Sequence, residues 1–234
     1  MTSDSSKYVV DLGPLPSLPV AGSELRFPVG RIYCVGRNYA EHAREMGHDP
    51  NREPPFFFMK PANAIVQNSA TLAFPVETKE VHHEIELVVA IGKGGKNIPV
   101  EKSLDHVWGY GVGLDMTRRD LQGEAKKMGR PWEMGKAFDE SAPCTALKPA
   151  AQIGHPAKGA IWVKVNGQTK QQGDLSQQIW NVREQIAYLS KLVTLQPGDL
   201  IFTGTPAGVG PVNPGDRLEG HIDGVGDLTI TYAR

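Results

Sequence analysis

The amino-acid sequence predicts a β-rich α+β protein. Its 26 glycines and 18 prolines are spread along 234 residues, with short runs rich in valine and isoleucine between them. This texture is typical of short strands joined by tight turns. Only one segment has a long helical period, and no regular alternation of strands and helices indicates a doubly wound sheet. We therefore expect one domain built mainly from short strands.

The composition narrows the class of protein. The chain has 40% hydrophobic residues, 22% charged residues and a formal net charge of −1, as expected for a globular protein with one sizeable core. No basic run with interleaved aromatics points to nucleic acid. No apolar run approaches the roughly 20 residues of a membrane span, and no signal-peptide pattern opens the chain, so we expect no membrane partner and a cytoplasmic location. The cysteines Cys34 and Cys144 lack a CxxC partner and are expected to be free core thiols.

The first elements follow in order along the chain. Residues 1–29, which include GPLPSLPVAG, are expected to be an extension packed on a single catalytic domain, residues 30–234. Residues 31–36 are expected to form a buried strand. Residues 37–47 are expected to form a short helix with Asn38 as its N-cap.

Residues 82–89, HHEIELVV, place two carboxylates in a predicted strand. Side chains alternate in a strand, so Glu84 and Glu86 share one face about 7 Å apart, with Ile85 and Leu87 on the other. Two like charges cost little at a solvated edge, and they are also what a cation site requires. These residues alone leave both interpretations open.

A third carboxylate ends another predicted strand. In WGYGVGLD, residues 108–115, three alternating glycines share a face with Asp115, and such a bare face admits a backbone or a ligand. If the three carboxylates converge, their oxygen atoms suit Mg²⁺, Mn²⁺ or Ca²⁺. Without a cation, three grouped anions in a partly buried site would destabilise the fold.

The second half of the chain predicts a hairpin and a helix. Asn166 and Gly167 lie between alternating residues, which is a strong hairpin signal. Residues 176–199 carry the helical period. Its apolar stripe consists of Ile179, Val182, Ile186, Leu189 and Leu192. The glycine-rich segments GKGGK and TGTPAGVG lack the features of a phosphate loop, so nucleotide binding is not expected.

Four further polar residues are candidates for chemistry. His42 and Glu45 are three apart on the predicted short helix, so they could form a general base for water or a solvated surface pair. Lys60 and Lys136 each interrupt an apolar or turn-like segment. They could bind a substrate carboxylate or an oxyanion, or extend to solvent. The two histidines that open HHEIELVV are expected to make structural hydrogen bonds.

Segments along the whole chain resemble the fumarylacetoacetate hydrolase family, particularly its short acylpyruvate and fumarylpyruvate hydrolase branch. The resemblance covers roughly residues 30–232 in the family's order. The segments are YCVGRNYAEHAREMG, FFFMKPANAIV, HHEIELVVAIGK, GYGVGLDMTRRDLQ, GKAFDESAP, VNGQTKQ and GDLIFTGTPAGVGP. This resemblance implies a rolled mixed β-structure with a few short helices, a homodimer, and one Mg²⁺ or Mn²⁺ ion per subunit.

The resemblance also implies roles for individual residues. The metal ligands would be Glu84, Glu86 and Asp115, and the water-activating dyad would be His42 and Glu45. The catalytic set would be completed by Lys136 near the metal-bound oxygens. The substrate-binding set would comprise Arg37, Lys60, Arg119, Gln122 and Thr205.

The implied reaction is metal-dependent hydrolysis of the C–C bond of a 2,4-diketo acid. Activated water would attack the distal carbonyl and pyruvate would leave as an enolate, which a Lewis-acid metal makes tolerable. Fumarylpyruvate, split to fumarate and pyruvate in gentisate-type aromatic degradation, is the leading substrate. The alternatives are acetylpyruvate hydrolysis, oxaloacetate decarboxylation or tautomerisation at the same site, and a non-catalytic binding module. A second substrate carboxylate would need a cation, for which Arg37, Arg119 and Arg130 are candidates.

Overall fold

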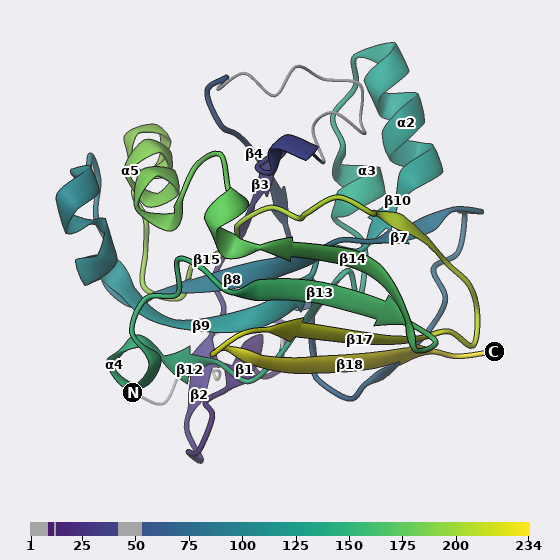
Figure 1. Cartoon of the computed structure of the whole chain (residues 1–234), viewed down its shortest axis with the longest axis horizontal. Helices are drawn as coiled ribbons and strands as arrows, with labels where there is room; N and C mark the ends of the chain where they lie inside the picture. The colour runs from purple at the N-terminus through teal and green to yellow at the C-terminus, as the bar shows by residue number, and fades with distance from the viewer. Residues whose placement is uncertain (1–8, 12, 42–52) are drawn as a thin grey trace.

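The computed structural model describes residues 9–11, 13–41 and 53–234, whose strands form four sheets. Two larger sheets lie one over the other, and the helices lie at their ends (Figure 1). The predicted helix at 37–47, with His42 and Glu45, falls largely on residues outside the described part of the chain. In the described part, no helix is both long and apolar enough to cross a membrane.

The largest sheet has eight strands in the order β4-β3-β15-β8-β9-β11-β5, with β12 beside β9. Parallel and antiparallel pairs are mixed, since β15 runs parallel to β3 and antiparallel to β8. The strands are β3 (Ile32–Gly36), β4 (Phe56–Lys60), β5 (Ile65–Gln67), β8 (Ile85–Ile91), β9 (Val107–Leu114), β11 (Ala142–Cys144), β12 (Lys148–Pro149) and β15 (Leu200–Phe202). The predicted strand at 31–36 is therefore present, whereas the strand predicted at 82–89 is divided at Glu84, and its larger part is β8.

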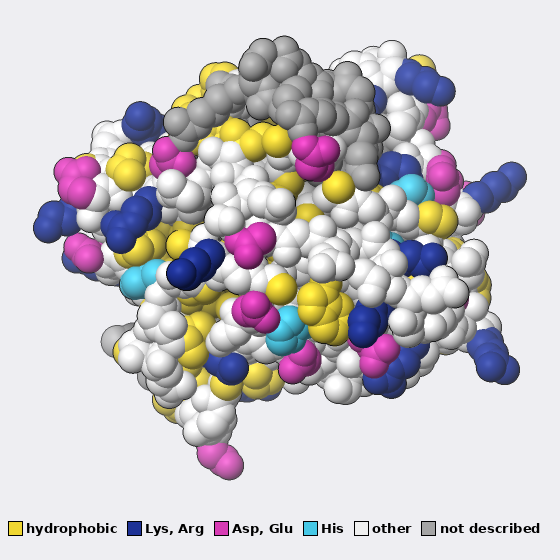
Figure 2. Space-filling view, viewed as in Figure 1, with side chains coloured by type: hydrophobic (Ala, Val, Ile, Leu, Met, Phe, Trp, Pro, Cys, Tyr) yellow, Lys and Arg dark blue, Asp and Glu magenta, His cyan; other side chains and the backbone are white. Residues whose placement is uncertain are grey.

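A five-stranded sheet in the order β14-β13-β17-β18-β6 covers β8 and β9. Its strands are β6 (Thr71–Leu72), β13 (Ala160–Val165), β14 (Gln168–Asp174), β17 (Arg217–Ile222) and β18 (Gly226–Tyr232). The predicted hairpin is confirmed: Asn166 and Gly167 join β13 to β14 with φ of 51° and 79°. Figure 2 shows acidic and basic side chains interspersed on the outer face of this sheet.

Two small sheets complete the strand set. β7 (Val81–His83) pairs with β10 (Thr117–Arg118) and β16 (Gly210–Val212). β1 (Ser17–Pro19) pairs with β2 (Arg26–Pro28), and buried Leu18 and Phe27 of this hairpin pack into the core. The division of the chain into an extension, 1–29, and one catalytic domain stays a prediction.

The hydrophobic core lies on both faces of the eight-stranded sheet. Along β8, Leu87 and Val89 face the core beneath the five-stranded sheet, whereas Val88 and Ala90 join Leu18 in a second core. The central strand is thus apolar on both sides beyond its first residues. Both cysteines are buried free thiols in the second core, as predicted.

The three glycines of β9 make room for protein rather than for a ligand. A Cβ on Gly109 would lie 2.4 Å from the carbonyl oxygen of Lys148 in β12, and one on Gly113 would lie 2.6 Å from Phe202. The bare face is therefore filled by a neighbouring strand and by core side chains.

The helices within residues 53–234 are short. They are α2 (Arg119–Met128), α3 (Glu133–Lys136), α4 (Ala150–Ile153) and α5 (Val182–Leu192), with 3-10 turns η2 (Ala62–Ala64), η3 (Val100–His106) and η4 (Leu175–Gln177). The helix predicted within 176–199 is shorter than its apolar stripe, because Asn181 caps it through a reciprocal bond with Glu184. Ile179 therefore precedes α5, and Leu192 is exposed.

Candidate metal centre and substrate pocket

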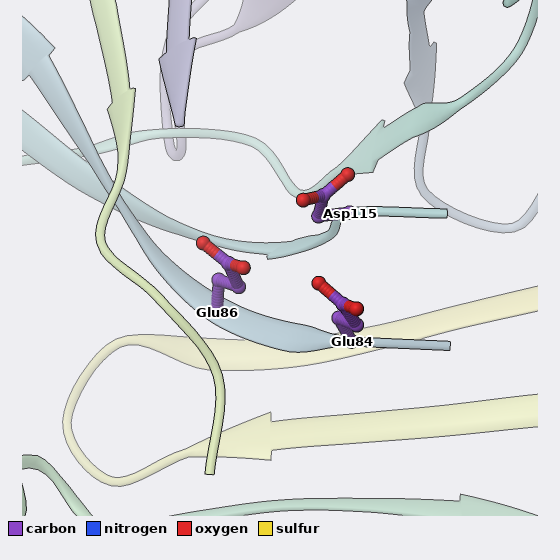
Figure 3. Close-up of side chains that lie close together, drawn as sticks. All are labelled: Glu84, Glu86 and Asp115. Atoms are coloured by element: carbon purple, nitrogen blue, oxygen red, sulfur yellow. The ribbon is translucent and has the colours of Figure 1, made fainter. Parts of the chain in front are cut away.

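Glu84, Glu86 and Asp115 converge, as the sequence predicts. One carboxylate oxygen from each residue lies within 4.8 Å of the other two, and all three residues are buried. Figure 3 shows two of these side chains along one strand segment and the third at the end of the neighbouring strand. The geometry matches a site for a hard divalent cation.

The sheet topology explains this convergence. Glu84 lies at the break between β7 and β8, where the chain passes from the three-stranded to the eight-stranded sheet. Asp115 directly follows β9, and its N–H donates to the carbonyl oxygen of Glu84 at 2.9 Å. In the next rung Glu86 lies opposite Gly113. Two antiparallel strands therefore place all three ligands at one sheet junction.

Lys136 supplies a cation inside this cluster. Its buried Nζ lies 2.8 Å from Glu84 Oε2 and 2.7 Å from Asp115 Oδ2, and donates to Thr117 Oγ1 at 2.6 Å. Burial opposes the charged form of Lys136, but Asp115 and Glu84 outweigh it and raise its pKa. Lys136 is therefore an ammonium ion at neutral pH.

Lys60 lies behind Asp115 rather than on the pocket surface. Its Nζ is 2.8 Å from Asp115 Oδ1 and donates to the carbonyl oxygens of Met116 and Lys136. Its side chain is fully buried and does not line the pocket. In this position Lys60 holds Asp115 and the backbone of Lys136 in place.

Arg119, the first residue of α2, provides the third cation. Its guanidinium donates to Glu84 Oε1, to Gln122 Oε1 at 2.7 Å and to His82 Nδ1 at 3.3 Å. The centre thus faces three carboxylates with three cations, and each cation contacts Glu84 or Asp115.

Glu86 is the carboxylate that these cations do not contact. Its Oε2 accepts one backbone hydrogen bond, from Gly204 N–H at 2.7 Å. Burial raises its pKa well above the usual value, and Asp115 and Glu84 raise it further. A divalent cation would relieve this repulsion, so the donor set fits Mg²⁺ or Mn²⁺.

Gly204 can approach Glu86 because it lacks a side chain. Its φ is +97°, in the left-handed region, and a Cβ there would lie 2.6 Å from the Cβ of Asn38. Asn38 in turn accepts from Trp180 N–H and donates to the carbonyl oxygen of Thr203. The backbone donor to Glu86 is thereby fixed from two sides.

Gln171 on β14 organises the other side of the centre, a role that the sequence did not indicate. Its Oε1 accepts from Ile85 N–H at 3.0 Å and lies 2.9 Å from His83 Nδ1. Its Nε2 donates to Thr205 Oγ1 at 2.8 Å. Both histidines of HHEIELVV make structural hydrogen bonds, as predicted, and burial lowers the pKa of each.

A pocket opens from the carboxylate cluster. The predicted residues that line it are Arg37, Glu84, Glu86, Arg119, Gln122, Lys136 and Thr205. Six lining residues were missed: Val35, Gly36, Phe56, Phe58, Lys126 and Trp132. Lys126 follows Gln122 by four positions, and on a helix this spacing places both side chains on one face. Because the sequence did not predict α2, this signal was not used. The roles of the site residues stay predictions, and His42 and Glu45 lie outside the described residues.

A buried three-carboxylate centre at the base of a polar and aromatic pocket defines a metal-dependent enzyme for a small anionic substrate. The family model "Fumarylacetoacetate (FAA) hydrolase C-terminal" matches residues 31–232. The chain belongs to the fumarylacetoacetate hydrolase family, which confirms the resemblance in the sequence.

Known proteins of this family show the same fold. Fumarylpyruvate hydrolase from Pseudomonas aeruginosa, solved in complex with Mn²⁺ and pyruvate, is 56% identical with a TM-score of 0.95; the match covers 97% of this chain and 99% of that one. Mitochondrial oxaloacetate tautomerase of Homo sapiens is 44% identical over 199 residues, 85% of this chain and 90% of the relative. Mitochondrial oxaloacetate decarboxylase of Dictyostelium discoideum is 42% identical over 196 residues, 83% and 89% of the two chains. The predicted α+β, strand-rich fold is confirmed.

Proposed function

We propose that this chain is a Mg²⁺- or Mn²⁺-dependent hydrolase that cleaves the C–C bond of acylpyruvates, with fumarylpyruvate as its main substrate. The carboxylate triad at the base of the pocket carries this proposal. Its support from relatives is the likeness to the Pseudomonas aeruginosa enzyme, which was solved with Mn²⁺ and with pyruvate, one product of this reaction.

The metal would be held by Glu84, Glu86 and Asp115. When bound, the ion supplies Lewis-acid stabilisation of negative charge on the substrate oxygens. Lys136, Lys60 and Arg119 already balance the three carboxylates, so the charge of the ion remains available to an anionic substrate.

Two residues at the inner end of the pocket can stabilise an oxyanion. Lys136 is cationic and adjoins the carboxylates. Gln122 accepts from Arg119 through Oε1, so its amide N–H groups are directed away from this arginine and can donate to a substrate oxygen. Donors fixed before the reaction favour the transition state because they need little reorganisation.

The base for water is proposed from the sequence. His42, oriented by Glu45, would remove a proton from the water that attacks the distal carbonyl. Protonation of the departing pyruvate enolate at carbon completes the reaction, which yields a carboxylic acid and pyruvate.

Oxaloacetate tautomerisation or decarboxylation is the second candidate. The human and Dictyostelium relatives bear these activities in their names and match more than four-fifths of this chain. Neither reaction needs an activated water, and decarboxylation needs no base to break its C–C bond, so a centre without its base could still decarboxylate oxaloacetate. Acetylpyruvate, the shorter acylpyruvate, is the remaining candidate substrate.

The discriminating experiment offers fumarylpyruvate, acetylpyruvate and oxaloacetate to purified protein, with EDTA and after Mg²⁺ or Mn²⁺ is restored. We expect fumarylpyruvate to have the highest kcat/KM. His42→Ala should abolish hydrolysis and retain any oxaloacetate decarboxylation. Hydrolysis by His42→Ala at the wild-type rate would show that the dyad assignment is wrong.

We also propose a cytoplasmic homodimer that acts in the breakdown of aromatic compounds. The resemblance to the acylpyruvate hydrolase branch supports this proposal. Size-exclusion chromatography with light scattering tests the dimer directly, and a monomer at micromolar concentration would contradict it.

A further inference from the structure

We propose that Lys126 binds the distal carboxylate of a dicarboxylic acylpyruvate and thereby determines substrate specificity. This inference rests on the proposed function, since it names the substrate class that the same pocket takes. It is carried by the position of Lys126 in the pocket and by the charges and rings around it.

Lys126 lies on the pocket face of α2, farther from the metal centre than its neighbours. Arg119, Gln122 and Lys126 are spaced i, i+3 and i+7, which places them on one helix face, and all three line the pocket. Arg119 contacts Glu84, and Gln122 contacts Arg119. At 1.5 Å per residue, Lys126 is about 6 Å farther along the helix than Gln122.

The cation of Lys126 has no carboxylate partner among the residues that the structure describes. Its Nζ lies 4.9 Å from the centre of the Trp132 ring. Arg37, also at the pocket surface, lies over Phe56 at 5.3 Å and forms no ion pair within the described ranges. Lys60, Lys136 and Arg119, in contrast, each contact a carboxylate.

Burial and neighbouring positive charges destabilise the ammonium form of Lys126 when no anion is bound beside it. Burial and, to a smaller extent, the positive charges of Arg119 and Arg37 together lower the pKa of Lys126 to about 8, against the opposite effect of Glu84. A half-buried ammonium ion near other cations gains free energy when an anion binds beside it. This end of the pocket is therefore suited to a carboxylate.

An aromatic wall connects the two ends. Lys136 Nζ lies 4.9 Å from the Phe58 ring, and Phe58 packs on Trp132 with ring centres 5.8 Å apart. Trp132 then contacts Phe56 edge-on, with ring centres 5.3 Å apart, and Lys126 Nζ lies over the Trp132 ring. A flat conjugated chain can pack along such a wall, with a terminal carboxylate at Lys126.

Fumarylpyruvate has this shape, because a planar double bond joins its 4-oxo group to the second carboxylate. Acetylpyruvate ends in a methyl group at the same place. In oxaloacetate the second carboxylate is one methylene from the ketone, so it stays at the inner end. Lys126 should therefore discriminate among these substrates without contacting their reacting atoms.

The test replaces Lys126 by methionine, which keeps the aliphatic stem on Trp132 and removes the charge. For fumarylpyruvate we expect kcat/KM to fall about 10- to 100-fold, mostly through KM, as for a lost charged hydrogen bond. For acetylpyruvate and oxaloacetate it should stay within about twofold. Lys127→Met, at the exposed neighbour on the same helix, is the matched control, and Lys126→Arg should restore most of the loss.

A substrate variant sharpens the test. The distal monomethyl ester of fumarylpyruvate should be as poor a substrate for the wild-type protein as the diacid is for Lys126→Met, and the two losses should not add. Equal losses on fumarylpyruvate and acetylpyruvate, or no loss on either, would overturn the inference while the proposed function stands. If the wild-type protein hydrolyses neither acylpyruvate, the proposed function fails and this inference fails with it.

Discussion

The two ends of the pocket use lysines in opposite ways. At the inner end, Lys136, and Lys60 behind the pocket wall, are fully buried and each contacts at least one carboxylate within 3 Å. At the outer end, Lys126 is half-buried and contacts an aromatic ring. The inner cations balance charges of the protein itself, whereas the outer cation is left for a ligand. Similar side chains in one pocket thus serve the metal centre at one end and substrate choice at the other.

The largest expected effect comes from removing the metal, or from removing the charge of Glu86, the metal ligand that Lys60, Lys136 and Arg119 do not contact. Glu86→Gln, like complete chelation, should lower hydrolysis by about 10³-fold or more, because several kcal/mol of Lewis-acid stabilisation are lost. Without metal, Glu86→Gln should melt at the same temperature as the metal-free wild-type protein or higher, since a neutral amide replaces a carboxylate whose pKa burial has raised. Steady-state kinetics and thermal melts measure both effects.

Partly exposed Glu219 on β17, which pairs with Arg217 outside the pocket, provides the control for this variant, and Glu219→Gln should change neither the rate nor the melting temperature by a comparable amount. Turnover that survives complete chelation would contradict the metal mechanism.

The next effect tests whether the inner cations maintain the fold. Lys60→Met leaves Asp115 without one of its cations and removes two donors to backbone carbonyls. Breaking a buried pair costs about 3–5 kcal/mol, or a fall in Tm of roughly 10 °C for a chain of this size. Thermal melts measure this loss.

Lys164 provides the comparison, because it also lies beside an aromatic ring, 4.8 Å from Trp162. Lys164→Met should change stability by less than about 0.5 kcal/mol. If the two variants melt at the same temperature, Lys60 does not stabilise the centre.

Local patterns in the sequence pointed to the metal ligands but left a solvated edge equally open, and the family resemblance decided between the two interpretations. The ExE alternation places Glu84 and Glu86 together, and Asp115 ends a strand whose glycines are visible in the sequence. Lys136 was also found, since a lysine in a turn-like context is conspicuous. The same alternation explains why Ile85 and Leu87, expected on the opposite face from the glutamates, lie in the core.

The rest depends on contacts between distant segments. Gln171 meets the β7–β8 junction across 86 residues of chain, and no local pattern marks it. Lys126 was missed because α2 has little apolar periodicity of its own, being rich in charged residues. Lys60 was expected at the substrate, but its position behind Asp115 follows from the pairing of β3 with β4.

The pH dependence of kcat/KM should show a smaller effect, which comes from Lys126 at the outer end of the pocket. Because the pKa of Lys126 is lowered to about 8, its charge is present below that pH and lost above it. The kcat/KM for fumarylpyruvate should therefore decline above about pH 8, whereas that for acetylpyruvate should not show this step. Arginine side chains are charged throughout this range, so the guanidinium groups at the pocket retain part of the attraction.

Lys126→Met should lack this step and Lys127→Met should keep it. A step of equal size for both substrates would assign the titration to a group at the inner end.

The smallest effect concerns a charged cluster outside the pocket. On the five-stranded sheet His221 lies 2.6 Å from Asp227 and 2.9 Å from Asp223. Burial opposes its charged form, but these carboxylates outweigh burial and raise its pKa above the usual 6.5. Its stabilisation is therefore full below pH 6.5 and lost as pH rises through the raised pKa.

His221→Gln should lower Tm slightly at pH 6 and leave it unchanged at pH 9, with wild-type kcat/KM throughout. If His221→Gln lowers kcat/KM, a charged cluster outside the pocket also affects catalysis, and the two ends of the pocket do not account for the activity by themselves.

The hydrogen bond from Gly204 to Glu86 affects the order in which the metal ligands are fixed while the chain is being synthesised. The two residues are 118 positions apart, so most of the chain must be synthesised before this donor exists. Glu84 and Asp115 are available much earlier, with Lys136 soon after them. On the ribosome, the third ligand is therefore fixed only after the segment that follows β15 emerges, long after the other two ligands are available.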